Sequence, residues 1–355
     1  MSHLPFLTVN PEDTKVNGGT IGADTTFGAH TTMPTVTASD LAASDIRAMT
    51  SKTGRSRSRI PDYVAFPLAV IITLGTSAGL YSAAAELTGH ELATVSRRID
   101  EPLQIGALVG WRVLELLVSW FAGFDYWDTA SLFLLTNSPY YVLLPIFYSI
   151  SPVSILLSLS IDLFSTVLPF FLLRSLNDYN DSVPSQSLTT SSTRLYIGLF
   201  STIIYATTLY TSLQTFLPSY IIGNFDLIRT VEAAHALSLP ILATACLPLG
   251  NAAKDFLFNP STYNSRGTRV EEFDPQTATL GETFAWNVGL SGWGLREDVL
   301  VGRTVMLILL TIGNSLAKIW GTVEGAEILG AVGWGSVFAA AHGLAGVGIG
   351  YVGDV

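Results

Sequence analysis

Charged residues are scarce in this chain. They make up 13% of its 355 residues, about half the share of roughly 25% that is typical of soluble globular proteins. Hydrophobic residues reach 49%. A chain of this length with so few charges is expected to expose much of its surface to lipid. The net charge of −10 at pH 7 also argues against a nucleic-acid partner, which would require a basic face.

Cysteine and recognisable catalytic motifs are also scarce. The single cysteine, Cys246, excludes an intramolecular disulfide and a cysteine-based metal site. The sequence holds no Walker A and no H-E-x-x-H motif. It therefore argues against ATP-driven transport by this chain alone, and it predicts no cofactor.

The first 60 residues are rich in Thr, Ser, Gly and Asp and contain no sustained apolar run. We therefore expect a disordered cytosolic tail over 1–60 and a transmembrane domain over 61–355. The tail ends in a basic patch that directly precedes the first apolar run. Basic residues at this position favour the cytosolic side of a membrane, where the lipid surface is anionic. The patch consists of Lys52, Arg55, Arg57 and Arg59.

Apolar runs long enough for a membrane-spanning helix recur along the rest of the chain. A bilayer core requires about 20 residues of helix. The sequence predicts an all-α, polytopic transmembrane bundle of about eight spans, with seven or nine as alternatives. The spans are expected near 64–86, 103–122, 129–149, 152–173, 194–217, 232–250, 303–322 and 328–351.

The connections between spans set the predicted topology. The short "SISP" stretch between the third and fourth spans predicts a tight antiparallel hairpin. A long cytosolic loop is expected over 251–302. Lys and Arg concentrate on the side of the basic patch, so both termini are predicted to be cytosolic. Span lengths near 20 residues suit the endoplasmic reticulum or the plasma membrane equally.

Two opposite charges interrupt the second apolar run. Arg112 and Glu115 are three residues apart, so they share one face of a helix. Asp162 lies in the middle of the fourth run. Charges at this depth cost about 2.5–3.5 kcal/mol each on insertion scales, so they are expected to face protein or a watery cavity. Two hypotheses remain open: a substrate or proton site, or a structural clamp between helices in which Asp162 is a partner of Arg112.

The third apolar run contains further unusual polar residues. Asn137 and Pro139 predict a break in the helix, of the kind that lines cavities in transporters but also occurs as plain scaffolding. Asp125 and Asp128 precede the run. They suggest a metal or lipid-headgroup site at the membrane face, or, for Asp128, a helix N-cap.

Two more features carry hypotheses. Glu232 and His235 form the Glu-x-x-His unit of di-iron bundles, which would require a second such unit. The alternative is an ion pair between Arg229 and Glu232. The glycine-rich span over 328–351 predicts close helix packing, either within the chain or with a second copy or another membrane protein.

Two stretches carry a family resemblance. They are "WRVLELLVSWFAGFDYWDTASLFLLTNSPYYVLLPIFYSIS" and "FDPQTATLGETFAWNVGLSGWG". They resemble an uncharacterised group of multi-pass membrane proteins of filamentous fungi, over residues 61–350. The resemblance implies a membrane setting and no particular activity.

The sequence therefore predicts a non-enzymatic integral membrane protein in contact with the lipid bilayer. Its most concrete version is small-molecule or ion transport through a cavity lined by the buried charges. The alternatives are a membrane-embedded enzyme acting on lipid and a non-catalytic assembly subunit.

Overall fold

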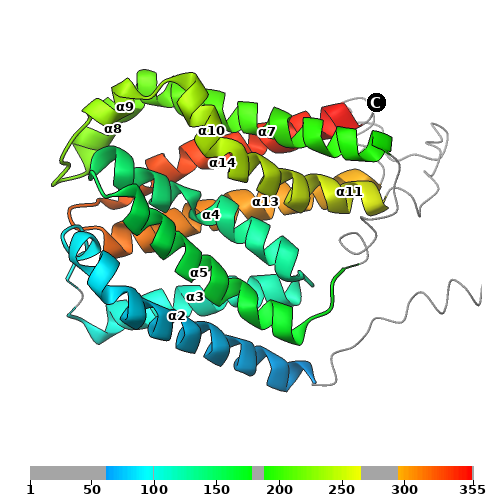
Figure 1. The fold of residues 1–355 in the computed structure, drawn as a ribbon, viewed down its shortest axis with the longest axis horizontal. Coiled ribbons are helices and arrows are strands. Elements are labelled where there is room, and N and C mark those ends of the chain that lie inside the picture. Colours follow the sequence, from blue (N-terminus) through cyan, green and yellow to red (C-terminus); the bar gives the residue numbers. More distant parts are fainter. Residues whose placement is uncertain (1–60, 99, 178–187, 265–294, 354–355) are drawn as a thin grey trace, which may run out of the picture. The chain divides into compact units, whose positions relative to one another are not determined.

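Every regular element that the structure describes is helical. The computed structural model describes residues 61–98, 100–177, 188–264 and 295–353, so the predicted tail and its basic patch lie outside the described residues. Figure 1 shows the helices in chain order. They are α2 (Asp62–Ala93), α3 (Pro102–Phe121), α4 (Tyr126–Phe147), α5 (Pro152–Leu173), α7 (Leu188–Gln214), α8 (Leu217–Asn224), α9 (Glu232–Ala236), α10 (Leu239–Ala253), η2 (Lys254–Phe258), α11 (Asn259–Asn264), α13 (Leu295–Asn314), η3 (Ser315–Trp320) and α14 (Ile328–Gly353).

Six helices in the described part of the chain are long and apolar enough to cross a membrane. They are Tyr63–Glu86, Pro102–Phe121, Tyr126–Phe147, Pro152–Leu173, Val299–Trp320 and Ile328–Val352. The helices α7 and α10, which hold the predicted fifth and sixth spans, are not among them. The all-helical fold class is therefore confirmed for the described residues, whereas the prediction of eight spans is not.

The helix starts are encoded locally. Pro102 and Pro152 occupy the first turns of α3 and α5, where a missing N–H costs no helical hydrogen bond. The hydroxyl of Ser151 accepts a hydrogen bond from the Ser154 amide at 3.3 Å and so caps α5. Only four residues join α4 to α5, and these helices pack together. They form the hairpin that "SISP" predicts.

The region around α10 differs from the sequence prediction. The helical run that begins with α10 continues through η2 and α11 to Asn264, and α13 begins at Leu295. The expected loop over 251–302 is therefore helical at both ends, while residues between these helices lie outside the described part. Lys254 and Asp255 interrupt the apolar pattern, but their side chains pair at 3.2 Å and the helix continues through them.

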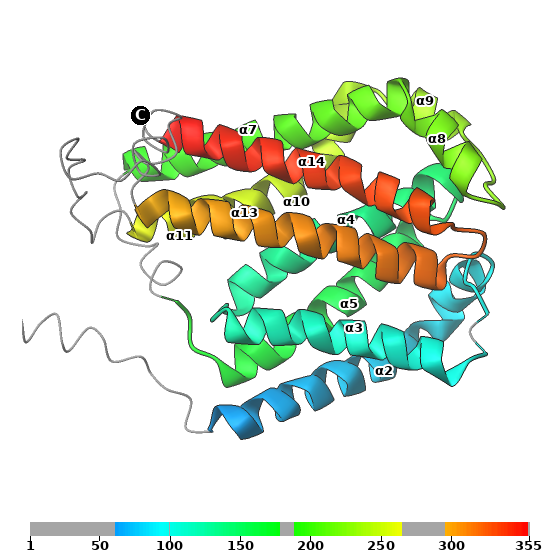
Figure 2. The same ribbon diagram turned by 180° about the vertical axis from the view of Figure 1, so that it is seen from behind.

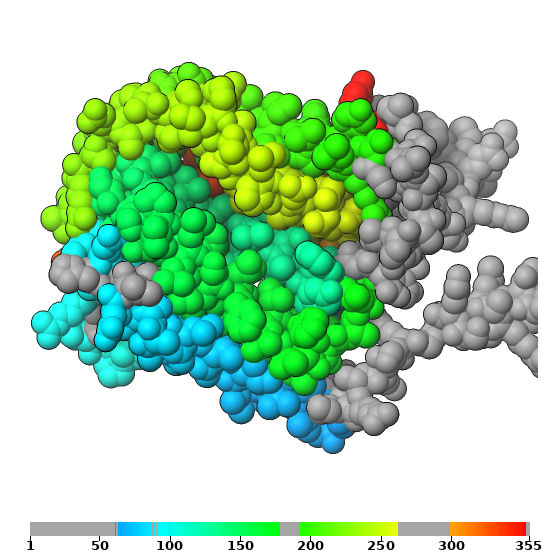
Figure 3. Space-filling view, viewed as in Figure 1, coloured from blue at the N-terminus to red at the C-terminus, as the bar shows by residue number. Residues whose placement is uncertain are grey.

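The helix α4 lies at the centre of the bundle. It packs against α5, α10, α13 and α14. Around it, α2 packs on α5, α3 contacts α2 and η3, and α14 packs between α13 and α7. Figure 2 shows α13 and α14 side by side, with α3 beside α13. In the space-filling view, α2 (blue) runs along an outer edge of the bundle (Figure 3).

Hydrogen bonds join the connecting segments at one end of the bundle. The Arg97 amide donates to the Thr322 carbonyl at 2.7 Å, and the Asp226 amide donates to the Gly325 carbonyl at 2.8 Å. Gly325 has a φ of +76°, and a Cβ there would lie 2.8 Å from the Asp226 carbonyl oxygen. Only glycine fits this turn without strain. The end that carries these turns is therefore held together by backbone contacts between distant segments.

Candidate functional site: a buried charge network

Arg112 and Glu115 pair on the inner side of α3. Nη1 of Arg112 lies 3.0 Å from Oε2 of Glu115, and their side chains are 16% and 13% exposed. The other terminal nitrogen of Arg112 donates to the Thr166 hydroxyl and to the main-chain carbonyl of Asp162. The Arg112 guanidinium therefore pairs with the Glu115 carboxylate on α3 and also connects α3 to α5 by hydrogen bonds.

The carboxylate of Asp162 forms an ion pair with Lys318, which lies in η3. Nζ of Lys318 lies 3.0 Å from Oδ2 of Asp162. The hydroxyls of Tyr81 and Tyr141 donate to the two carboxylate oxygens at 3.0 and 2.6 Å. The structure brings Asp162 and Arg112 together, as one of the two hypotheses expected, but the hydrogen bond is to the main-chain carbonyl of Asp162. The ion-pair partner of the Asp162 carboxylate is Lys318.

We call this set of residues the charge network: Arg112, Glu115, Asp162 and Lys318, with Tyr81, Tyr141 and Thr166. Its two positive and two negative charges cancel, and it connects α2, α3, α4, α5 and η3. The Phe133 ring lies beneath both cations, at 5.5 Å from the Arg112 guanidinium and 5.4 Å from the Lys318 ammonium. Mutual pairing is the arrangement that makes buried charges tolerable in a membrane.

Sequence reasoning did not place Lys318 in the network. Lys318 lies at the end of an apolar span, where a lysine ordinarily reaches to the membrane surface. In the structure it lies in η3, a π-helical segment of six residues. Such segments widen the helix locally and often mark functional or strained positions. The sequence shows an acidic residue, Asp162, in one apolar run and a basic residue, Lys318, in another. It does not show how the two helices align.

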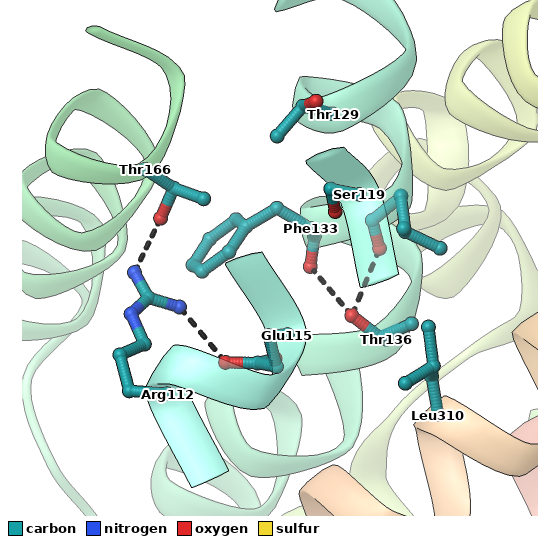
Figure 4. A pocket seen from close by; sticks show the side chains of 9 residues that line it. Arg112, Glu115, Ser119, Thr129, Phe133, Thr136, Thr166 and Leu310 are labelled. Atoms are coloured by element: carbon teal, nitrogen blue, oxygen red, sulfur yellow. Dashed lines mark hydrogen bonds and ion pairs between the residues drawn. The ribbon is translucent and has the colours of Figure 1, made fainter. Parts of the chain in front are cut away.

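A crevice lies beneath α3, beside the Arg112–Glu115 pair (Figure 4). It has a volume of about 20 Å³ and is lined by Arg112, Glu115, Ser119, Thr129, Leu132, Phe133, Thr136, Thr166 and Leu310. These residues come from α3, α4, α5 and α13. This volume can hold about one water molecule. Asn137 and Pro139, which were expected to line a cavity with the charges, are not among the lining residues.

The expected helix break at Pro139 is absent, because α4 continues unbroken from Tyr126 to Phe147. Pro139 cannot donate to the Leu135 carbonyl, and the Ser138 hydroxyl donates to that carbonyl instead, at 2.8 Å. The amide of Asn137 is buried and donates to the Phe133 carbonyl. Both residues therefore belong to the packed interior of α4.

Asp125 and Asp128 form a second polar group, at the start of α4. Asp125, rather than Asp128, is the N-cap, because its Oδ1 accepts from the Asp128 amide at 2.9 Å. Oδ1 of Asp128 lies 3.1 Å from Nη1 of Arg303. Asn177 donates to both carboxylates. Its main-chain N–H donates to Asp125, and its side-chain amide donates to Asp128.

This aspartate cluster is buried, with Asp125 at 0% and Asp128 at 1% exposure. Arg303 also lies 4.9 Å from the rings of Phe124 and Phe256. Within the described residues, no three His, Cys, Asp or Glu side chains gather as a metal site would require. Carboxylates enclosed in this way are placed to anchor α4 to α13 rather than to meet a lipid headgroup at the surface.

Glu232 and His235 lie in the five-residue helix α9, and both are exposed. Arg229 does not pair with Glu232. Its guanidinium donates to the Tyr148 carbonyl at 3.3 Å and to the Thr94 hydroxyl at 2.8 Å. The ion pair that we expected here is therefore replaced by contacts that hold the turns at this end of the bundle.

The glycines of α14 pack against other helices of the same chain. A Cβ at Gly335 would lie 2.5 Å from the Ser315 hydroxyl, and one at Gly346 would lie 2.6 Å from the Thr304 hydroxyl. The predicted close packing of this span is therefore an intramolecular contact at these positions. The glycines of α2 and α3 behave differently, because a Cβ would meet nothing within 4 Å. They are Gly75, Gly79, Gly106 and Gly110.

One stretch of α2 also matches a catalytic pattern, because residues 75–79 read G-T-S-A-G. In hydrolases, the G-x-S-x-G pattern holds its serine on a sharp strand-to-helix turn. Here it lies in the interior of a continuous helix. The structure therefore does not present Ser77 as an activated nucleophile.

The described fold is a helical bundle in which six helices are long and apolar enough to cross a bilayer, and the four charges of the charge network are paired. Comparison with known families adds one finding. Residues 190–337 match the family model of the Bouquet formation protein 3 C-terminal domain, a fungal family. The matched part begins in α7 and ends within α14. No curated protein and no solved structure matches the chain.

Proposed function

We propose that the protein is a non-catalytic integral membrane subunit that assembles with another membrane protein through α2 and α3. The contrast between glycines carries this proposal. A Cβ at Gly335 or Gly346 of α14 would meet side chains of α13 and η3, whereas a Cβ at Gly75, Gly79, Gly106 or Gly110 would meet nothing within 4 Å. In membranes, pairs of small residues four apart let helices approach closely and associate. On α2 and α3 such pairs are free to receive a helix from outside the chain.

The charge network supports a structural role for the interior. Its cations and carboxylates are paired with one another, and the crevice beside them can hold about one water molecule. This geometry gives less support to transport of a small molecule, which requires a site of the substrate's own size. It favours a network that fixes the positions of five helices.

The family match suggests the process in which the subunit acts. Its model is named for bouquet formation, and we propose that this chain takes part in that process as a membrane component. We further propose a multi-pass topology with both termini in the cytosol, in the endoplasmic reticulum or the plasma membrane.

A pair of matched glycine variants tests the assembly. Gly79→Leu fills an open position on α2. Gly302→Leu fills a position on α13 that likewise has nothing within 4 Å, and it serves as the control. We expect Gly79→Leu to lose a stoichiometric partner on purification while its melting temperature stays close to that of the parent. Gly302→Leu should keep the partner. Retention of every co-purifying protein by both variants would contradict the proposal.

A further inference from the structure

The ion pairs of the charge network differ in how far apart their partners lie in the sequence. Arg112 and Glu115 are three residues apart on α3, so their charges balance as soon as α3 forms. Asp162 and Lys318 are separated by 156 residues. At a synthesis rate of roughly 5–20 residues per second, Lys318 is made about 8–30 s after Asp162. The Asp162 carboxylate is therefore present in the growing chain long before the cation that pairs with it.

A second long-range ion pair uses the same late helical run. Nη1 of Arg303 lies 3.1 Å from Oδ1 of Asp128, which precedes it by 175 residues. Arg303 and Lys318 both belong to the continuous run of α13 and η3, Leu295–Trp320. One late run thus supplies the cations for acids on two earlier helices, α4 and α5. When α13 and η3 pack onto the bundle, they provide charge partners for both acids at once.

The two members of the Asp162–Lys318 pair differ in how well each is tolerated alone. Asp162 lies at the middle of α5, and an unpaired charge at that depth in a membrane is costly. Arg112 cannot replace Lys318, because a pair with Asp162 would leave Glu115 unpaired. Lys318, in contrast, is two residues from Trp320, where its apolar span ends. Its long side chain can therefore reach towards the membrane surface when Asp162 is absent.

We propose that the pairing of Lys318 with Asp162 acts as a completion check on the inserted chain. Until α13 and η3 pack onto the bundle, α5 presents an uncompensated acid, and chains that remain in this state are degraded. Cells continuously remove incompletely folded proteins through chaperones and proteases. The hydroxyls of Tyr81 and Tyr141 also donate to Asp162, but they come from earlier helices and carry no charge, so they do not neutralise it.

Turnover in cells tests the proposal on the full-length chain. We expect pulse-chase labelling to give Lys318→Met a half-life several-fold shorter than that of the parent, and proteasome inhibition to restore it. Asp162→Asn should keep a half-life close to that of the parent, because no acid is left unpaired. The double variant should do so too, although it has no ion pair. Arg98→Met is the control, since the Arg98 side chain is 89% exposed and pairs with an exposed aspartate.

The asymmetry between the two single variants decides the outcome. A merely structural ion pair depends on both of its members, whereas the completion check depends on the unpaired acid. If Asp162→Asn or the double variant is degraded as fast as Lys318→Met, the pair is a structural contact and the proposal is wrong. Half-lives close to that of the parent for all three variants would also overturn it, because the unpaired acid would then have no effect on turnover.

Discussion

The helices α3 and α4 are of similar length but are held in the bundle by different forces. In α4, 72% of the apolar stretch is buried, and in α3 only 17% is. The helix α4 contributes many residues to the main apolar core and packs against α5, α10, α13 and α14. The helix α3 is held at a few points, through the Arg112 guanidinium, the Trp111 indole and the small apolar cluster around Trp120.

This difference bears on why a helix as little buried as α3 carries two charges. Lipid tails are as apolar as leucine, so an apolar helix gains little hydrophobic energy by leaving lipid for the bundle. Packing, which requires extensive contact, or polar bonds across the interface must then hold the helix. Since α3 has little contact, the bonds from Arg112 to α5 supply the specificity that packing supplies for α4.

The largest expected loss of unfolding free energy comes from a substitution in the buried helix α4. Phe147→Ala on α4 removes a fully buried ring that packs edge-on against Trp334. We expect a loss of about 3–5 kcal/mol in unfolding free energy, as for other large cavities. Phe121→Ala on α3 is the control, because that ring is 71% exposed. Denaturation in detergent should separate the two variants clearly, and similar losses would remove the distinction between the helices.

Glycine substitutions, which add side-chain volume instead of removing it, should also distinguish a closely packed helix from α3. Gly335→Leu on α14 places side-chain atoms where Ser315 already lies, and overpacking of this kind costs about 1–3 kcal/mol. Gly110→Leu on α3 enters open space and should change the melting temperature little. If Gly110→Leu destabilises the isolated protein as much as Gly335→Leu does, then α3 is packed more closely than the structure shows.

A smaller effect is expected where α3 meets α13. The Trp111 indole nitrogen donates to the Asn314 side-chain oxygen at 2.6 Å. Trp111→Phe keeps an aromatic ring above Gly313 but removes this hydrogen bond, which should cost about 0.5–1.5 kcal/mol. Asn314→Leu in the same background should then cost little more, because its partner is already gone. Additive losses in a double-mutant cycle would show that the two side chains act independently.

The sequence was sufficient to predict the helical membrane fold and the pairing of Arg112 with Glu115. Both follow from local information, namely long apolar runs and a spacing of three residues on a helix. The same information placed the buried acid Asp162 but not its partner. Which residues of different helices meet depends on how the helices align, and the π-helical segment that contains Lys318 changes that alignment.

Other differences have similar physical causes. The expected break at Pro139 did not form, since Ser138 satisfies the carbonyl that the proline leaves free. The N-cap of α4 is Asp125, one turn earlier than expected, because its own carboxylate accepts from the Asp128 amide. The partners that Asn177 and Arg303 provide for the two aspartates come from distant segments, and such hydrogen bonds leave no local pattern in the sequence.

The most direct test of the account is a double-mutant cycle on the Arg112–Glu115 pair. The variants are Arg112→Gln, Glu115→Gln and the double mutant, compared by melting in detergent and by abundance in cells. Removing one member of a buried pair leaves the other uncompensated and typically costs about 3–5 kcal/mol. If the pair holds α3 in place, each single variant loses stability and the double mutant recovers part of the loss. If all three variants melt like the parent, the pair does not stabilise the fold, and the structural account of the charge network is wrong.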